Sequence, residues 1–149
     1  MSDVQTSAGT VLGVSSAAPA TYDAVGFAAL TFTEIGEITE FGEFGREYNL
    51  VTHNPLSTRR TVKRKGSYND GNVAAQLGRV PDDAGQAILI EGRDSDDSYS
   101  FIITLQDGSL SYFSGQIMSY TNNVGGVDQI NMASVTIEID NDIIEVAAA

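Results

Sequence analysis

Apolar and polar positions alternate in residues 99–105, and residues 110–120 follow as a second run that returns along the first. A period of two is typical of a strand that buries one face and exposes the other. Between the runs stands Asp107-Gly108, a pair that favours a tight turn between two strands. The pattern therefore predicts a β-hairpin over residues 99–120.

Further runs with strand character lie on both sides of this hairpin. Residues 130–140 alternate in the same way, and residues 72–80 follow the turn signal Asn69-Asp70-Gly71 with apolar residues at alternate positions. Threonine and branched residues dominate residues 31–38, which favours another strand. A last short strand is expected through Ile143-Ile144. The chain is thus predicted to be mainly β.

Helical signals are confined to two short segments. Residues 81–92 begin with a proline and two aspartates, which suit the first turn of a helix, and continue with apolar residues at helical spacing. Gly92 is expected to end this helix in a left-handed conformation. Thr21 is the expected cap of a helical turn over residues 23–30, where Gly26 weakens the signal. We expect a β-sandwich or distorted barrel with one short helix.

The 149 residues suit a single domain, 1–149, with two segments outside its expected core. Residues 1–20 are small and polar and predict an irregular N-terminal arm. Residues 42–68 contain Pro55 and many polar residues, and they predict a long loop or hairpin whose second arm runs over residues 59–65. A connection of this length without a helix is usually functional.

Charge is distributed unevenly along the chain. Eight basic and 20 acidic residues give a net charge of −12. Residues 46–65 hold six of the basic residues and one acidic residue, a charge of +5, which leaves −17 for the rest. An acidic run without any basic residue comes just before this segment: Glu34, Glu37, Glu40 and Glu43. Adjacent blocks of opposite sign indicate either pairing within the chain or head-to-tail contacts between copies.

The residue types that common catalytic and metal sites need are absent or isolated in the sequence. His53 is the only histidine and there is no cysteine, which disfavours zinc binding and Ser–His–Asp catalysis. The glycines at 36, 42 and 45 match no phosphate-binding motif, and the aspartates at 94, 96 and 97 lack the spacing of an EF-hand loop. We predict no catalytic residue, no metal site and no cofactor, so the chain is not expected to be an enzyme.

Membrane and nucleic-acid binding are disfavoured as well. No apolar run approaches the ~20 residues that cross a bilayer, and the first residues lack the features of a signal peptide. The absence of cysteine fits synthesis in a reducing cytoplasm. The acidic majority of the chain would repel DNA phosphates and anionic lipid. An extracellular adhesin or carbohydrate-binding sandwich is the alternative of another class, and the lack of tryptophan argues against sugar stacking.

Several segments, taken in order, resemble the major tail tube proteins of long-tailed (siphovirus-type) bacteriophages and gene transfer agents. They are residues 19–27, 32–38 and 59–66, the turn at 69–71, the helix from Pro81, the 99–120 hairpin and the loop Gly125-Gly126-Val127-Asp128. The resemblance covers nearly the whole chain. It implies a β-sandwich or barrel flanked by a helix, the fold of type VI secretion tube proteins, without an added C-terminal immunoglobulin-like domain.

The resemblance also implies an assembly. Such subunits form hexameric rings that stack into a tube, and the strands of six subunits join into one β-barrel around a lumen. A tape measure protein fills the lumen before double-stranded DNA passes, and a tail terminator and a distal tail protein are further partners. The expected location is the virion tail, after synthesis in the cytoplasm of the host bacterium. The alternative within this fold is the tube of a type VI secretion or other contractile injection machine.

Two sets of site residues follow from this expectation. A lumen that lets DNA slide is expected to be negative and free of basic side chains, because lysine and arginine bind phosphates. Contacts between subunits or rings are therefore predicted for the basic residues Arg46, Arg59, Arg60, Lys63, Arg64 and Lys65. Acidic residues on half-polar strands are predicted to line the lumen, with Glu34, Glu37, Glu138 and Asp140 as candidates.

Overall fold

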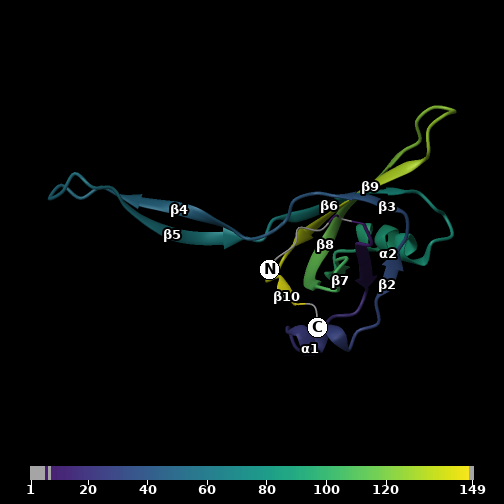
Figure 1. Cartoon of the computed structure of the whole chain (residues 1–149), viewed down its shortest axis with the longest axis horizontal. Helices are drawn as coiled ribbons and strands as arrows, with labels where there is room; N and C mark the ends of the chain where they lie inside the picture. The colour runs from purple at the N-terminus through teal and green to yellow at the C-terminus, as the bar shows by residue number, and fades with distance from the viewer. Residues whose placement is uncertain (1–5, 7, 148–149) are drawn as a thin grey trace.

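The computed structural model describes residue 6 and residues 8–147, and its main element is an eight-stranded antiparallel sheet (Figure 1). In chain order the elements are β1 (Val11–Ser15), α1 (Ala24–Ala28), β2 (Thr33–Ile35), β3 (Ile38–Phe41), β4 (Glu47–His53), β5 (Val62–Asn69), β6 (Asn72–Gly78), α2 (Ala84–Arg93), β7 (Tyr99–Thr104), β8 (Leu110–Asn123), β9 (Met132–Ile139) and β10 (Ile144–Val146). The mainly β class is confirmed, whereas the prediction of a single helix is wrong.

The large sheet is rolled into an open barrel. Its strands follow the order β2-β1-β7-β8-β9-β6-β3, with β10 beside β8. The two edge strands, β2 and β3, are consecutive in the chain and are separated only by Gly36 and Glu37. Because so short a link spans at most ~10 Å, the two edges of the sheet lie near each other at this corner. Glu37 turns the chain there with a φ of 62°. The predicted distorted barrel is thus present in an open form.

The core lies inside the rolled sheet. Every second residue of β6 and β9 is buried there: Val73, Ala75, Leu77, Ala133, Val135, Ile137 and Ile139. Helix α2 adds Leu89 to the same cluster, and the rings of Phe101 and Phe113 stack at 5.2 Å between centroids. Each fully buried side chain of this kind stabilises the fold by about 1.5–3 kcal/mol. The predicted alternation over residues 99–105 and 130–140 is therefore confirmed, whereas β8 shifts its register between Ile117 and Ser119.

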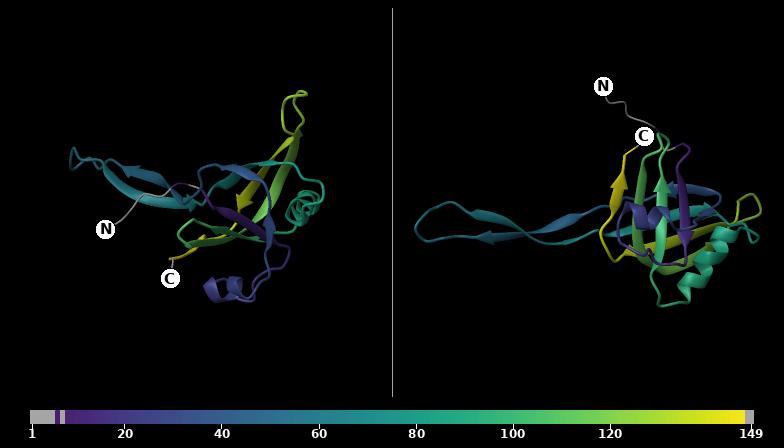
Figure 2. Two further views of the ribbon diagram at one scale, coloured as in Figure 1. Left: turned by 45° about the vertical axis from the view of Figure 1, so that its right-hand side comes forward. Right: turned by 90° about the horizontal axis from the view of Figure 1, so that it is seen from below.

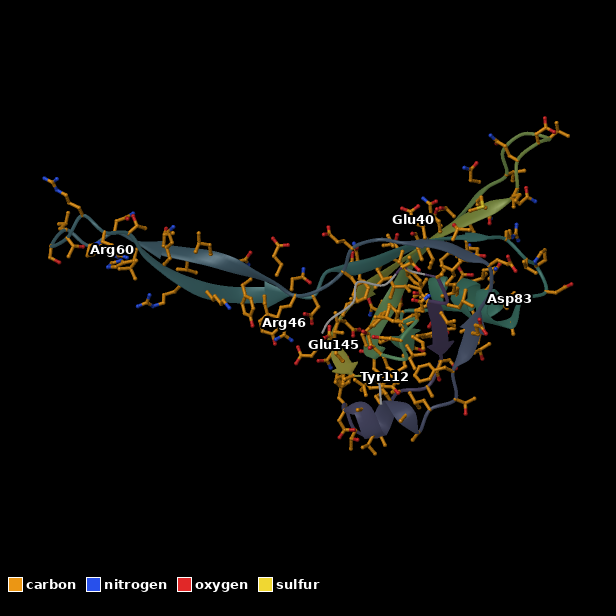
Figure 3. The ribbon with its side chains drawn as sticks, viewed as in Figure 1. Glu40, Arg46, Arg60, Asp83, Tyr112 and Glu145 are labelled. Atoms are coloured by element: carbon orange, nitrogen blue, oxygen red, sulfur yellow. The ribbon has the colours of Figure 1, made fainter. Side chains whose placement is uncertain are left out.

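Helix α1 packs on the outer side of the sheet, beside β8 and β10 (Figure 3). Phe27 is fully buried, and its ring stacks on Tyr112 at 5.3 Å. The predicted cap at Thr21 is wrong, because the Asp23 carboxylate accepts the Gly26 N–H at 2.7 Å. This backbone hydrogen bond lowers the pKa of Asp23.

Helix α2 begins and ends later than the sequence predicted. Its N-cap is Asp83, whose carboxylate accepts the Gln86 N–H at 3.0 Å, so Pro81 lies before the helix and not in its first turn. Gly92 lies inside the helix, where a Cβ would stand 2.4 Å from Ile117 Cδ1. The glycine therefore allows close packing of α2 on β8, and the prediction that it ends the helix is wrong.

The prediction of an irregular arm over residues 1–20 is wrong for residues 11–15. Residues 11–15 form β1, which pairs with β2 on one side and β7 on the other. Leu12 and Val14 are fully buried in the core. Residues 1–5 and 7 lie outside the described residues. Because small residues such as Gly13 separate these side chains, the hydrophobic pattern of the sequence does not indicate a strand here.

Candidate assembly surfaces

The β4–β5 hairpin extends away from the barrel as a separate two-stranded sheet (Figures 1 and 2). It continues the β3–β6 pair beyond the body of the protein, and its β4 residues are exposed throughout. The two strands, Glu47–His53 and Val62–Asn69, occupy most of the segment over which the sequence predicted a long loop or hairpin. A two-stranded ribbon with no core of its own gains little from isolated folding, so an arm of this kind is typical of a contact element.

Aromatic and basic side chains stiffen the base of the hairpin. The Arg46 guanidinium lies 4.1 Å from the centre of the Tyr68 ring, and the Lys65 ammonium lies 4.7 Å from the centre of Tyr48. Tyr48 and Tyr68 face each other across the strands with ring centroids 5.3 Å apart. The four side chains therefore share one face of the hairpin and form a continuous ladder, with each cation–π contact contributing about 0.5–1 kcal/mol at such exposed positions.

Two carboxylates hold this ladder to the barrel. Arg46 donates from Nε to Asp70 at 3.2 Å and from Nη2 to Asp142 at 3.0 Å, and Tyr68 donates its hydroxyl to Asp142 at 3.2 Å. The Tyr48 side chain and then Asp70 raise the pKa of Arg46, and the hydrogen bond to Asp142 raises the pKa of Tyr68. Arg46 thus anchors the hairpin within its own chain.

The other five predicted contact residues lie further out. Arg59 and Arg60 precede β5 at the far end, where Figure 3 labels Arg60, and Lys63, Arg64 and Lys65 lie on β5 itself. All five are exposed. Throughout the described part of the chain, no ion pair joins any of them to a carboxylate. Pairing of the two charge blocks within one chain is therefore not seen, and contact between copies is the alternative that the sequence left open.

A second exposed surface is the outer face of four adjacent strands, which we call the polar face. The register of β3, β6, β9 and β8 places its side chains in rows across the sheet. The rows consist of Glu40-Gln76-Ser134-Thr121, Ala74-Thr136-Ser119 and Asn72-Glu138-Gln116. These rows contain small and polar residues, two glutamates and no basic residue. Neither described helix covers them, since α1 packs near β10 and α2 near β2, β1 and the core side of β8.

Both margins of the polar face are strand edges. On one margin β3 is the last strand of the sheet. On the other, β7 pairs only with residues 110–115 of β8, so residues 116–123 have no strand on that side. Arg93 occupies part of this margin by donating to the Tyr120 carbonyl at 3.3 Å. Exposed strand edges are sites at which another chain can pair.

The four acidic residues predicted for a lumen do not share one surface. Glu138 lies on the polar face, where it accepts a hydrogen bond from Asn72 at 3.3 Å. Asp140 follows β9 and accepts hydrogen bonds from Ser98 and Ser114. Glu34 lies on β2, away from these rows. Glu37 stands at the corner before β3, where its Cβ lies 3.6 Å from the place that a Cβ on Gly78 would take. Gly78 follows Gln76 on the outward side of β6, so Glu37 borders the polar face. The polar face instead brings Glu40 to the row beside Gln76 (Figure 3), a residue that the candidate list omitted.

A buried polar side chain fixes the corner at which the sheet edges meet. Gln86, which is 2% exposed, donates from Nε2 to the carbonyls of Gly36 at 3.1 Å and Gly78 at 3.0 Å. Its Oε1 accepts from the Val80 N–H at 2.9 Å and the Tyr120 hydroxyl at 3.3 Å. The side chain therefore ties the β2–β3 corner to β6 and β8, and sets the position of both margins.

The described residues form neither a metal site nor a membrane-spanning helix. His53 is exposed on the hairpin, away from the core. Among the described residues, no group of three or more histidine, aspartate or glutamate side chains is arranged to hold a metal ion. Within those residues no helix is long and apolar enough to cross a membrane. The charged hairpin and the polar face are therefore the candidate surfaces for assembly.

Comparison with known proteins identifies the fold. No protein-family model matches the sequence, and no curated protein matches it. A chain of the anti-feeding prophage baseplate superposes with a TM-score of 0.71 at 10% identity, covering 99% of both chains. A chain from the tail of an empty GTA particle, described with C6 symmetry, gives 0.70 at 10% identity and covers 97% of this chain and 100% of its own.

The SPP1 tail tube provides a third comparison. Its chain gives a TM-score of 0.64 at 13% identity and covers 91% of this chain and 75% of its own. The chain therefore has the fold of structural components of phage-type tails and contractile injection systems. At identities of 10–13% the likeness shows the fold alone.

Proposed function

We propose that this chain is the tail tube subunit of a long-tailed phage or phage-like particle, and that its copies form hexameric rings that stack into a hollow tube. The polar face carries this proposal: it is an uncovered sheet face of four strands, without basic residues, and with a strand edge at each margin. Two exposed strand edges would be a liability in a monomeric domain, because their unpaired backbone groups can pair with another chain.

Ring closure follows from joining these two margins. The β3 edge of one copy would lie beside residues 116–123 of β8 in the next, so that the polar faces of six copies form one continuous barrel. Closing a sheet on itself removes its free edges. The two margins differ, so the contact is heterologous, which is the kind of contact that generates rings. The C6 symmetry described for the GTA tail supports a sixfold ring.

The lumen of this tube would be lined by the polar face. Glu40 and Glu138 supply its negative charge, and Asp140 stands at the end of the same strand. Acidic side chains repel phosphates, and small neutral side chains offer them no positive charge, so double-stranded DNA would pass without binding. The chain would act through this shape and charge and would not be an enzyme. Glu37, which borders the polar face beside Gly78, would stand at the margin of this lining, whereas Glu34 falls outside it.

The basic hairpin would join successive rings. No ion pair joins its five outer cations to a carboxylate of the described chain, and the remainder of the protein carries −17, so another copy offers the complementary charge. A tape measure protein inside the lumen, a tail terminator and a distal tail protein would complete the partners of a tail tube. The site of action would be the virion tail, after synthesis in the host cytoplasm.

The proposal is tested by assembly of the purified protein. We expect electron microscopy of the wild-type chain to show hollow tubes with a regular axial repeat. The double variant Arg59→Glu, Arg60→Glu should remain a folded monomer or ring that does not polymerise, while Arg79→Glu in the body should still form tubes. Wild-type protein that stays monomeric at high concentration, including with a tail initiator complex added, would contradict the proposal.

A contractile injection machine is the second candidate. It is favoured by the likeness to the anti-feeding prophage baseplate chain and to a chain from the PVC sheath/tube terminator, the latter with a TM-score of 0.71 at 12% identity. The same ring and lumen would serve this machine. The two candidates differ on the outside of the tube, because a contractile machine needs a sheath. Binding of a sheath protein from the same gene cluster to assembled tubes would favour the second candidate.

A further inference from the structure

The loop between β8 and β9, residues 124–131, forms a second protrusion from the barrel (Figure 1). It exposes three apolar side chains: Val124 at 63%, Val127 at 99% and Ile130 at 76%. The loop is ordered by its own hydrogen bonds, because Gln129 accepts from the Gly126 N–H at 2.9 Å and donates its own N–H to the Gly126 carbonyl at 3.1 Å. It therefore holds apolar groups in water at a fixed place.

The β4–β5 hairpin exposes apolar groups of the same kind at the other end of the molecule. Leu50, Val51 and Leu56 are 66%, 52% and 106% exposed, and they lie among the basic residues of this hairpin. Figure 1 shows the hairpin at one end of the long axis and the β8–β9 loop with α2 at the opposite end. One chain cannot bring these two groups together, whereas two chains in a row can.

Charge supports the same arrangement. Beyond its tyrosine ladder the hairpin carries Arg59, Arg60, Lys63 and Arg64, which form no ion pair with the described residues. Exposed carboxylates surround α2: Asp82, Glu91, Asp94, Asp96 and Asp97. Among these, Asp94 pairs with Arg93 at 3.2 Å. The long axis of the molecule thus runs from a basic end to an acidic end. Apolar contacts surrounded by complementary charge are the usual composition of a specific interface.

We infer that the β4–β5 hairpin of one copy docks on the β8–β9 loop and the α2 end of a second copy in the adjacent ring. Val127 and Ile130 contact the apolar residues of the hairpin, and the carboxylates around α2 face its cations. The contact is head-to-tail, so it repeats without closing and extends the stack. This inference rests on the proposed tube and adds the surface that receives the hairpin.

Crosslinking tests the contact directly, since the wild-type chain has no cysteine. Leu56→Cys protein is mixed with Val127→Cys protein under conditions that form tubes, treated with a short bismaleimide and digested. We expect a crosslinked peptide pair joining positions 56 and 127. The control replaces Val127→Cys with Val25→Cys, which is 78% exposed on α1 and lies away from both ends. A crosslink to position 25 as frequent as that to 127, or none to 127 within tubes, overturns the inference.

Assembly measurements give an independent readout. The variant Val127→Ser, Ile130→Ser should raise the protein concentration needed for tubes by roughly tenfold or more, because each buried apolar side chain contributes about one such factor. Val25→Ser should leave that concentration unchanged. If both variants form tubes at the wild-type concentration, the inference is overturned, and the proposed tube function still stands. Absence of tubes from wild-type protein instead refutes the proposed function, and recruitment of the wild type to anionic vesicles without any 56–127 crosslink would assign the hairpin to a membrane.

Discussion

Arg46 and Asp142 are 96 positions apart in the chain and form an ion pair of 3.0 Å at the base of the β4–β5 hairpin. The same carboxylate accepts the Tyr68 hydroxyl, and the Asp142 carbonyl accepts the Tyr22 hydroxyl at 2.6 Å. Residues preceding α1, the hairpin and the segment before β10 therefore meet at Asp142. The direction of the hairpin is fixed by this junction together with the tyrosine ladder.

Removing the Asp142 charge should loosen the hairpin and leave the barrel intact. In Asp142→Asn, amide hydrogen exchange in β4 and β5 of the monomer is expected to accelerate roughly twofold to fivefold, because exposed ion pairs contribute about 0.2–1 kcal/mol. Exchange in β8 and β9 should not change. Asp94→Asn removes another exposed pair, with Arg93, and serves as the control. Equal acceleration in all four strands would contradict a local role.

Alkaline pH should weaken the same junction. The pKa of Tyr68 is raised, chiefly by its hydrogen bond to Asp142. A raised pKa in the folded state means that the stabilisation is complete below about pH 10, the ordinary tyrosine value, and is lost as pH rises through the higher pKa. The difference in unfolding free energy between wild type and Tyr68→Phe should be constant up to about pH 10 and shrink above it. A difference that grows above pH 10 would contradict the assignment.

Among the polar residues of the barrel, substitution of Gln86 should lower the unfolding free energy most. Replacing it with leucine leaves the Gly36 and Gly78 carbonyls, the Val80 N–H and the Tyr120 hydroxyl without this partner. We expect Gln86→Leu to lower the unfolding free energy in urea by about 3–5 kcal/mol, as for other buried networks. The exposed Gln116→Leu should change it by no more than about 0.5 kcal/mol. Similar small values for both variants would show that the corner does not depend on Gln86.

The sequence predicted the strands that follow a simple period and missed those that do not. Residues 99–105 and 130–140 alternate regularly, so the faces of these two strands could be assigned. β1 has only two large buried side chains, Leu12 and Val14, among small residues, so its pattern is too short to stand out. Pro81 and Asp83 both signal a helix start, and only tertiary contact decides between them, since Asp83 also accepts the Gly36 N–H.

The segment from 34 to 45 shows why the candidate lumen residues were only partly placed. It consists of four triplets, Glu34-Ile35-Gly36, Glu37-Ile38-Thr39, Glu40-Phe41-Gly42 and Glu43-Phe44-Gly45. A period of three fits neither a strand nor a helix. The structure accommodates it with the turn at Glu37 and a register shift between Ile38 and Glu40. The second residue of each triplet then packs against the core, and the four glutamates are exposed along the bent path.

Reversing charge on the polar face should make the tube retain DNA. We expect tubes of Glu40→Lys, Glu138→Lys to cosediment with double-stranded DNA at low salt at least roughly tenfold more than wild-type tubes, and to release it as salt rises. Glu145→Lys, on β10 outside this face, should behave as wild type. If the reversed tubes do not assemble, Glu40→Gln, Glu138→Gln gives the neutral case, for which a smaller increase is expected. No increase in assembled tubes of either variant would place the polar face away from the lumen.

A cryo-electron microscopy map of assembled tubes tests the central claim most directly. We expect the map to show a hollow tube whose wall is one continuous β-barrel. In it, the β3 edge of each copy lies beside residues 116–123 of β8 in its neighbour, and Glu40 and Glu138 face the lumen. A map of a solid filament, or of a tube in which the polar face is buried between subunits or turned outward, would contradict it.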